Sequence, residues 1–177
     1  MLATIAIRCI IFNNMPVLIT SDIHGSRDGV SLLQDAIRKF RPESIISAGD
    51  QCPDEENAAF YSSLKAVRGN CDRFYEYGNI PFPPVSLTME AYGHRITVTH
   101  GDRLWLDDFL LNPGDIFISG HTHVPMLEIE NGIYICNPGS PSRPRSSEGP
   151  SAALLDDSGL SLISLLSLEP LGTLPFL

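Results

Sequence analysis

Five short polar segments, each placed directly after an apolar run, constrain the fold of this chain most strongly. They combine Asp, His or Asn with a neighbouring glycine, and they are Asp22-Ile23-His24-Gly25, Gly49-Asp50, Gly69-Asn70-Cys71-Asp72, His100-Gly101 and Gly120-His121-Thr122-His123. The carboxyl ends of parallel strands lie side by side, and ligands bind in the crevice outside them. We therefore expect the five segments to converge at one edge of a sheet.

The first half of the chain alternates predicted strands with predicted helices. Strands are expected at Val17–Thr20, Ser44–Ala48 and Ala66–Arg68, and helices at Asp28–Phe40 and Asp54–Lys65. The first helix is indicated by apolar residues spaced three and four apart, and the second by acidic residues at its start. Asp22, Asp50 and Asn70 follow successive strands at intervals of 28 and 20 residues, which suits parallel strands joined by crossover helices.

The second half of the chain is dominated by predicted strands. They are expected at Val85–Glu90, His94–Thr99, Asp115–Ser119, Pro125–Glu130, Ile133–Cys136, Ala152–Leu155 and Leu160–Leu168, with a short helix at Leu104–Leu111. The Asn131-Gly132 pair is a strong two-residue hairpin signal. The sequence therefore predicts a single α/β domain at residues 15–177. Residues 1–14 are predicted to be an N-terminal extension, because Met15 stands just before the first clear strand.

Two segments allow two interpretations each. Pro, Ser and Gly make up 11 of the 14 residues of Pro138–Ser151. This composition is typical of a flexible linker between strands, and the alternative is an active-site loop. The apolar tail at residues 171–177 can pack back on the domain or form a subunit contact in a homo-oligomer.

Charge and composition argue against several kinds of partner. The formal net charge of −9 is incompatible with a broad basic face for stable binding of duplex nucleic acid. No apolar run reaches the roughly 18 residues of a membrane span. The four cysteines are dispersed and none lies in a CxxC pair, so a reducing, cytoplasmic location is predicted. A phosphate-containing substrate is compatible with this acidic chain if metal ions supply positive charge locally.

The polar segments together offer seven metal-ligating side chains. They are two carboxylates, four imidazoles and one amide: Asp22, His24, Asp50, Asn70, His100, His121 and His123. Mixed carboxylate and imidazole ligands suit Mn, Fe, Zn or Ni better than Ca. Seven donors suit two ions that share a carboxylate, the arrangement used for displacement at phosphorus. Taken singly, Gly49-Asp50 or Gly69-Asn70 could be only a turn. His94 fits none of the segments and is expected to be a surface histidine or part of a hairpin.

As an ordered set, these motifs resemble those of the calcineurin-like metallophosphoesterase superfamily, and in particular its small YfcE-like phosphodiesterase branch. The resemblance runs from about Pro16 to Leu168 and includes Asn137-Pro138-Gly139-Ser140. It implies an α/β fold in which two mixed β-sheets flanked by helices form a four-layer αββα sandwich. It also implies metal-dependent hydrolysis of small phosphodiesters.

The resemblance implies a role for each ligand. The first of two divalent metal ions takes Asp22, His24 and His123, the second takes Asn70, His100 and His121, and Asp50 bridges them. Mn²⁺ is the expected metal, with Ni²⁺, Zn²⁺ or Fe²⁺ as alternatives. In the family mechanism a metal-bridging hydroxide attacks phosphorus, which implies catalytic roles for Asp50, Asn70, Cys71 and His121.

Cys71 stands where many relatives carry a histidine that is thought to protonate the leaving group. A thiol has a reference pKa of about 8.5, against about 6.5 for imidazole, so it is the poorer proton donor near pH 7. This difference favours diesters with good leaving groups, or cyclic nucleotides, over monoesters. The alternative is that Cys71 is only a small buried filler.

Three further side chains are candidates for supporting roles. Arg143 lies in the Pro138–Ser151 segment and is predicted to contact the substrate phosphate, with a solvated loop charge as the alternative. Asp72 is expected to orient a neighbouring ligand or to form a local turn. Trp105 follows the His100 segment, and we expect it to pack in the core rather than to wall a base-binding pocket.

Two other functions are compatible with the same fold. One is a non-catalytic interaction module, like the retromer subunit that resembles these enzymes. The other is a phosphomonoesterase. All seven ligand positions carry competent donors, which favours an enzyme over an interaction module. The thiol of Cys71 favours a diesterase over a monoesterase.

Overall fold

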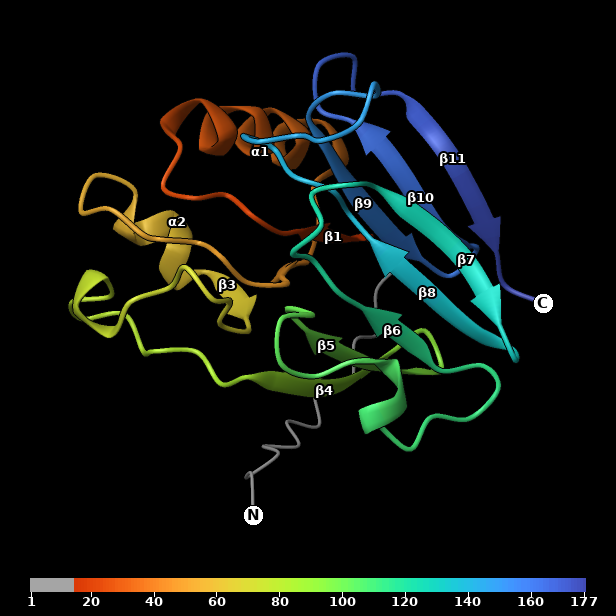
Figure 1. Ribbon diagram of the computed structural model, residues 1–177. Helices are drawn as coiled ribbons and strands as arrows, with labels where there is room; N and C mark the ends of the chain where they lie inside the picture. Colours follow the sequence, from red (N-terminus) through yellow and green to blue (C-terminus); the bar gives the residue numbers. More distant parts are fainter. Residues whose placement is uncertain (1–14) are drawn as a thin grey trace.

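Two mixed β-sheets pack face to face, and helices cover the outer side of one of them (Figure 1). The computed structural model describes residues 15–177, so the predicted N-terminal extension at residues 1–14 lies outside the described residues. The first sheet has six strands in the order β11-β10-β9-β1-β2-β3, and the second has five in the order β4-β5-β6-β8-β7.

Each sheet joins a parallel unit to antiparallel strands. In the six-stranded sheet, the parallel strands are β1 (Val17–Thr20), β2 (Ser44–Ser47) and β3 (Leu64–Ala66), and the antiparallel strands are β9 (Ser151–Asp156), β10 (Gly159–Ser164) and β11 (Pro170–Pro175). In the five-stranded sheet, β5 (His94–Thr99), β6 (Ile116–Ile118) and β8 (Ile133–Asn137) are parallel, and β4 (Ser86–Ala91) and β7 (Met126–Glu130) are antiparallel edges.

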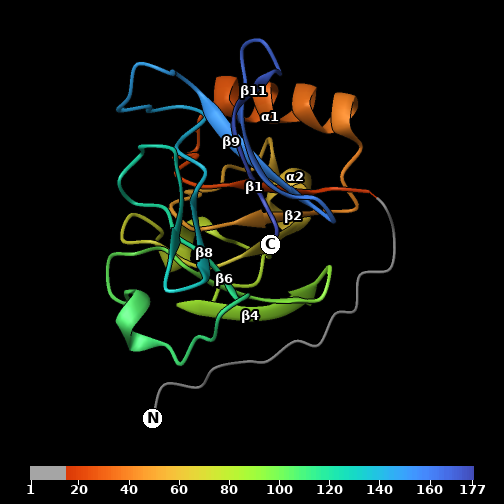
Figure 2. The ribbon, with the colours of Figure 1, turned by 90° about the vertical axis from the view of Figure 1, so that its right-hand side faces the viewer.

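Alternation of side chains along each strand divides the core into two parts. Val17 and Ile19 of β1 face the second sheet and pack in one cluster with Ile96 of β5 and Ile116 of β6. Leu18, between them, points the other way and packs with helix α1 (Arg27–Phe40). Figure 2 shows the resulting layers, with α1 above the sheet that contains β1 and β2, and with β4 and β6 below it. The predicted fold of two mixed sheets flanked by helices is confirmed.

α1 forms where its sequence predicts it, because the residues at both of its ends cap the helix and one of its faces is apolar. The Ser26 hydroxyl accepts a hydrogen bond of 3.1 Å from the backbone N–H of Gly29 at the start of the helix. Arg41 ends the helix in the left-handed conformation, with φ of 49°. Val30 and Leu33 on the buried face pack against the six-stranded sheet.

The outer side of the second sheet carries much less helix. There a single 3-10 turn, η2 (Leu106–Asp108), leads to Phe109, whose ring lies 5.8 Å from that of Phe117 on β6. The fourth layer of the sandwich is therefore one turn of chain rather than a full helix. Within residues 15–177, no helix is long and apolar enough to cross a membrane.

The predicted helix at Asp54–Lys65 is wrong over most of its length. The helix α2 covers only Ala58–Ser62, and β3 already begins at Leu64, two residues before the strand predicted at Ala66–Arg68. The Asp54 carboxylate accepts a 2.7 Å hydrogen bond from the N–H of Asn57. This bond closes a turn over residues 54–57, the acidic segment expected to start the helix. Local side-chain hydrogen bonds therefore replace the first turn of the expected helix.

The predicted helix at Leu104–Leu111 is also wrong, because only η2 forms there. The Asp108 carboxylate accepts a hydrogen bond of 2.8 Å from the N–H of Trp105, which closes a single turn. Phe109 then has extended backbone angles, which stop the helix. The Trp105 side chain is 59% exposed, so the expectation of core packing for it is wrong as well.

The C-terminal tail packs back on the domain. The strand predicted at Leu160–Leu168 ends at Ser164, and β11 follows as an additional edge strand paired with β10. The Phe176 ring stacks on His94 with 3.9 Å between ring centroids, and it also meets the ring of Tyr134. His94 lies at the start of β5 in the β4–β5 hairpin, the second of its two expected places, and it is a half-buried anchor for the tail.

Candidate metal centre

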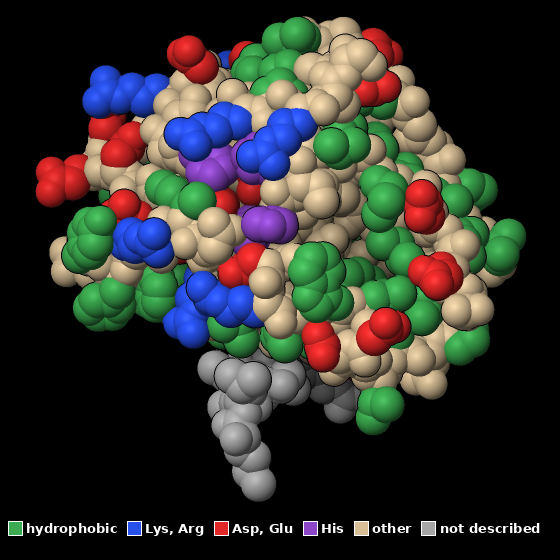
Figure 3. All heavy atoms as spheres, in the orientation of Figure 1, with side chains coloured by type: hydrophobic (Ala, Val, Ile, Leu, Met, Phe, Trp, Pro, Cys, Tyr) green, Lys and Arg blue, Asp and Glu red, His purple; other side chains and the backbone are tan. Residues whose placement is uncertain are grey.

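The polar segments that follow β1, β2, β3, β5 and β6 meet at one site. Two backbone N–H groups tie them together: that of His121 donates to the Asp22 carboxylate at 3.0 Å, and that of Cys71 donates to Asp50 Oδ1 at 2.7 Å. Figure 3 shows histidine and carboxylate side chains reaching the surface on this face, with Lys and Arg side chains beside them. Segments about a hundred residues apart in the sequence thus form one site.

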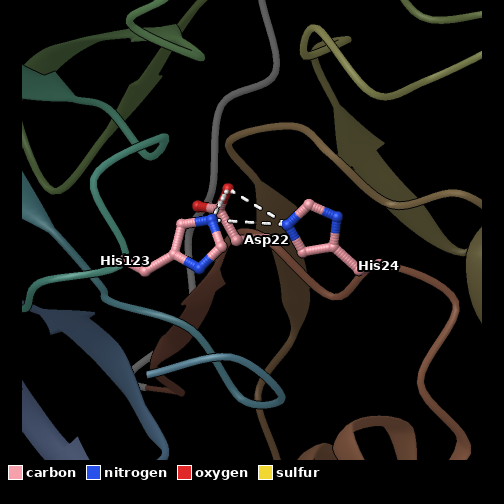
Figure 4. A group of neighbouring side chains, drawn as sticks. All are labelled: Asp22, His24 and His123. Atoms are coloured by element: carbon pink, nitrogen blue, oxygen red, sulfur yellow. Dashed lines mark hydrogen bonds and ion pairs between the residues drawn. The ribbon is translucent and has the colours of Figure 1, made fainter. Parts of the chain in front are cut away.

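Asp22, His24 and His123 form the first cluster of potential ligands (Figure 4). His123 Nε2 lies 3.1 Å from Asp22 Oδ1 and 3.3 Å from His24 Nε2. His24 Nε2 lies 3.8 Å from the same carboxylate oxygen. Figure 4 shows both rings and the carboxylate pointing toward a common centre.

Asp50, Asn70 and His100 form a second cluster beside the first. His100 Nε2 lies 3.5 Å from Asp50 Oδ2 and 3.3 Å from Asn70 Oδ1. The same oxygen of Asp50 lies 3.8 Å from His24 Nε2 in the first cluster. Asp50 is therefore the side chain that the two clusters share.

Two histidines are held with one ring nitrogen directed at the carboxylates. Nδ1 of His100 lies 2.8 Å from the carbonyl oxygen of Ala48, and Nδ1 of His123 lies 2.7 Å from that of Arg143. A carbonyl oxygen only accepts, so both Nδ1 atoms carry hydrogen and donate. In the neutral rings, both Nε2 atoms then present lone pairs to the oxygens around them.

This arrangement fits a metal ion. Asp22 Oδ1 is buried and has no hydrogen-bond partner, although His123 Nε2 lies close to it. Acceptor atoms that face one another across about 3.5 Å require a cation between them, either a proton on the imidazole or a metal ion. The residue types match those that hold divalent transition metals.

The carboxylate and imidazole pKa values reflect the same geometry. Burial works to raise the pKa of Asp50, but hydrogen bonds from His100 and from the Cys71 amide outweigh it and lower that pKa. Burial works to lower the pKa of His100, but the hydrogen bond with Asp50 raises it to about 9. Burial lowers the pKa of His24, and the positive charge of Arg143 adds to the shift.

Asp72 holds the loop that carries Asp50. Its buried carboxylate accepts four backbone hydrogen bonds of 2.8 to 2.9 Å, from Asp50, Gln51, Cys52 and Gly69. These contacts join the loop after β2 to the loop after β3. Asp72 thus orients a neighbouring ligand, the first of the two roles expected for it.

Strained backbone is concentrated among the potential ligands. Their φ angles are positive, at 55° for Asp22, 50° for His24, 52° for Asp50, 67° for His121 and 61° for His123. Residues other than glycine adopt this region at a cost of about 1–3 kcal/mol each and keep it only where the surroundings hold them. Such strain is typical of sites in which side-chain direction matters more than stability.

The Pro138–Ser151 segment is part of the site rather than a free linker. The hydroxyls of Ser140 and Ser142 donate to the Asp22 carbonyl at 2.8 and 3.1 Å. The Arg143 carbonyl accepts from His123, while its N–H donates to Ser140 Oγ at 2.9 Å. The exposed Arg143 side chain therefore extends from a loop that is fixed to the potential ligands Asp22 and His123.

Two of the predicted site residues lie at the margin of these clusters. His121 has its ring 5.2 Å from the ring of His100, in an edge-to-face arrangement. The Cys71 thiol lies within 4.8 Å of ligand atoms of both His24 and Asp50. The structure thus brings all seven predicted ligands, together with Cys71, to one place.

Sequence reasoning missed why two glycines precede site residues. A side chain at Gly69 would overlap the Asp50 carboxylate, and one at Gly120 would overlap the hydroxyl of Ser21. Neither requirement is local, because each neighbour comes from a distant loop. The sequence feature that indicates such a requirement is the repeated placement of glycine directly before a potential ligand.

Comparisons with known proteins agree with this site. The model of the calcineurin-like phosphoesterase superfamily domain matches residues 15–159. Phosphodiesterase YfcE of Escherichia coli K12 is 28% identical over 170 residues, which span 85% of this chain and 92% of that protein. A probable metallophosphoesterase of Methanothermobacter thermautotrophicus is 31% identical over 158 residues, which span 84% of this chain and 89% of that protein.

Solved structures share the same architecture. The phosphoesterase YfcE from E. coli superposes with a TM-score of 0.84 at 25% identity and covers 92% of this chain and 100% of its own. Vps29 from Entamoeba histolytica, solved with Zn²⁺, superposes with a TM-score of 0.67 at 22% identity, which shows a common fold alone. Since the family model spans most of the chain and the ordered ligands meet in one site, the chain belongs to the calcineurin-like phosphoesterase superfamily.

Proposed function

We propose that the protein is a metal-dependent phosphodiesterase that hydrolyses small phosphodiesters at a site for two divalent metal ions. The observation that carries the proposal is the position of Asp50 Oδ2, which lies between His24 of one cluster and His100 of the other. A carboxylate shared by two sets of donors is what a two-ion site requires. The name of the E. coli relative, a phosphodiesterase, supports the same reaction.

The proposed ligands follow from the two clusters. Asp22, His24 and His123 hold the first ion, Asn70, His100 and His121 hold the second, and Asp50 bridges them. Mn²⁺ is the proposed metal, with Ni²⁺, Zn²⁺ and Fe²⁺ as alternatives of similar ligand preference. When bound, such ions lower the pKa of water toward neutrality and offset the negative charge of a phosphate.

The side chains of the protein prepare the site for this chemistry. Asp50 stays ionised because His100 and the Cys71 amide hydrogen-bond to its carboxylate. The carbonyls of Ala48 and Arg143 direct Nε2 of His100 and His123 into the site. The ligands are therefore oriented before substrate arrives, which reduces the reorganisation needed for the reaction.

Arg143 is the proposed substrate contact. Its positive charge lowers the pKa of His24, so it acts on the first cluster. A guanidinium can bind two phosphate oxygens at once. Its backbone is fixed by Ser140 and His123, so the side chain extends from a defined position at the edge of the site.

Cys71 restricts the proposed substrate to diesters. Burial, together with the negative charge of Asp50, raises the pKa of the Cys71 thiol to about 11. A thiol with this pKa donates a proton poorly near neutral pH, so the leaving group must depart with little help. This favours diesters with good leaving groups, a class that includes cyclic nucleotides.

Hydrolysis of bis(p-nitrophenyl) phosphate tests the proposal. Metal-stripped protein is assayed with and without added Mn²⁺, beside the monoester p-nitrophenyl phosphate. We expect Mn²⁺-dependent cleavage of the diester, weak cleavage of the monoester, and loss of both in Asp50→Asn. The Cys71→His variant is expected to gain monoesterase activity. The proposal is wrong if no turnover occurs with Mn²⁺, Ni²⁺, Zn²⁺ or Fe²⁺, and a non-catalytic interaction module would then explain the fold.

A further inference from the structure

A cavity of about 350 Å³ lies between the edge strands of the two sheets, apart from the ligand clusters. Its walls are β3, β4, the segment at residues 80–84 and two tyrosines, Tyr61 and Tyr77. None of the seven proposed metal ligands lines it. Figure 1 shows β3 above β4 at this open edge of the sandwich.

The size and walls of the cavity suit a small ligand that contains an aromatic ring. Sites for small ligands in proteins measure roughly 300 to 1,000 Å³ and are mostly apolar with a few polar groups. Here Phe82, Pro83, Leu87 and Met89 provide flat and flexible apolar surface. Aromatic rings and methionine are well suited to contact a planar ligand.

The Tyr61 hydroxyl supplies a polar group that the fold itself does not satisfy. The tyrosine is 1% exposed, and its hydroxyl oxygen is buried without a hydrogen-bond partner. A buried hydroxyl without a partner is destabilising, so native proteins rarely leave one unpaired. Tyr77, which also lines the cavity, has a buried hydroxyl without a partner as well. An acceptor on a molecule in the cavity would supply a partner that the fold itself lacks.

The charges around Tyr61 determine what kind of acceptor fits. Burial raises the pKa of Tyr61, and the carboxylates of Asp54 and Asp72 raise it further. The hydroxyl therefore stays protonated and donates. The Asp72 carboxylate also accepts a hydrogen bond of 2.9 Å from the backbone N–H of Gln51, a lining residue, so negative charge lies beside the cavity. This charge disfavours an anionic ligand, and we therefore expect a neutral carbonyl oxygen as the acceptor.

We propose that this cavity binds a neutral aromatic or heteroaromatic ring that bears a carbonyl group, whose oxygen accepts a hydrogen bond from Tyr61. Gln51, which follows Asp50 directly, also lines the cavity. Its side chain donates to the Val67 carbonyl at 3.3 Å, and its backbone N–H donates to Asp72. A ligand bound here lies one residue along the chain from the shared carboxylate of the metal centre. The site does not depend on the proposed function.

Titration with benzamide, followed by the side-chain methyl resonances of Leu64, Leu87 and Met89, tests the proposal. We expect saturable shifts at these methyl groups in the metal-stripped full-length protein. The Tyr61→Phe variant should bind benzamide about three- to tenfold more weakly, as expected for one lost hydrogen bond. It should remain folded with an unchanged or higher melting temperature, because the substitution removes only the hydroxyl. Tyr75→Phe, at an exposed tyrosine, is the matched control and should bind benzamide like the unaltered protein.

Three results would overturn the proposal. One is the absence of shifts at these methyl groups up to the solubility limit of benzamide. A second is equal affinity of Tyr61→Phe, which would mean that an ordered water satisfies the hydroxyl. The third is tighter binding of benzoate than of benzamide, which would mean that Lys65, another lining residue, selects an anion.

Discussion

Nε2 of His100 lies 3.5 Å from Oδ2 of Asp50, while Nδ1 of the same ring donates its hydrogen to the Ala48 carbonyl. When the ring is neutral, Nε2 carries a lone pair, so it and Asp50 Oδ2 are two buried acceptors that face each other. Without metal, the ring takes up a proton to resolve this conflict. At the proposed metal site the ion would replace that proton, so metal binding and protonation should compete at one nitrogen.

We expect Mn²⁺ affinity of the stripped protein to rise with pH. Although burial opposes it, the hydrogen bond with Asp50 raises the pKa of His100 to about 9. Below that pH the metal must displace a proton, so affinity should increase by up to about tenfold per pH unit and level off above pH 9. Calorimetric titrations in buffers of different ionisation enthalpy should report about one proton released at pH 7.

The control for this titration is His94→Gln, which alters a histidine outside the site. It should release the same number of protons as the unaltered protein. Mn²⁺ affinity that stays constant between pH 6 and pH 9 would contradict the prediction.

Substitution of Asp72 should weaken metal binding without touching a ligand. In Asp72→Asn, the amide group would present N–H donors where four backbone N–H groups now need an acceptor. Removal of such a support typically costs 10- to 100-fold in metal affinity, and the unpaired amides should lower the free energy of unfolding by about 2 kcal/mol. Metal titration and urea denaturation measure the two effects.

Asp35→Asn is the control for Asp72→Asn. It makes the same chemical change at a half-exposed carboxylate, which pairs with Arg38 on α1. Its effect on unfolding should stay within about 0.5 kcal/mol, as for most surface changes. If Asp72→Asn behaved like Asp35→Asn, the loop would not depend on the Asp72 carboxylate.

Replacement of Gly69 by alanine should displace Asp50. The new Cβ would overlap the Asp50 carboxylate and approach its backbone nitrogen within 2.8 Å. We expect Gly69→Ala to lose about 2 kcal/mol or more of stability, or to fold with strongly reduced Mn²⁺ affinity. At Gly172, a Cβ would meet no atom within 4 Å, so Gly172→Ala is the control and should be nearly neutral.

Loss of the Arg143 guanidinium should affect substrate binding more than turnover. Arg143→Ala is expected to raise KM for bis(p-nitrophenyl) phosphate about tenfold, in line with one lost charge-assisted hydrogen bond. Steady-state kinetics at saturating Mn²⁺ measures this. Arg27→Ala, which removes an exposed arginine paired with Glu56, should leave KM unchanged. An unchanged KM in Arg143→Ala would identify Arg143 as a solvated loop charge.

The C-terminal tail should contribute to stability through Phe176. Its ring stacks on His94 and meets Tyr134 edge-on, and the N–H of Leu177 donates to the Tyr134 hydroxyl at 2.8 Å. Phe176→Ala should lower the free energy of unfolding by about 1–2 kcal/mol, because a partly buried aromatic contact is lost. Leu171→Ala, at a more exposed position on the neighbouring strand β11, should cost less than about 0.5 kcal/mol. Equal effects would mean that the tail is only loosely attached.

The sequence by itself determined the parallel strands, α1 and the set of potential ligands. These features are encoded locally: buried strands are short apolar runs, α1 has its own cap and apolar face, and the potential ligands lie in short glycine-containing segments that follow strands. Topology alone then predicted that Asp22, Asp50 and Asn70 share one edge of the fold. Local signals failed at α2 and η2, where Asp54 and Asp108 accept backbone hydrogen bonds that compete with helix formation.

Only the tertiary structure decided how the ligands are aimed. The Ala48 and Arg143 carbonyls that fix the rings of His100 and His123 lie 52 and 20 residues away from them along the chain. The amides that bind Asp72 and the space that requires glycine at position 69 likewise come from separate loops. No local pattern encodes such contacts, because hydrogen-bond direction and close packing depend on how distant segments meet after the two sheets have packed.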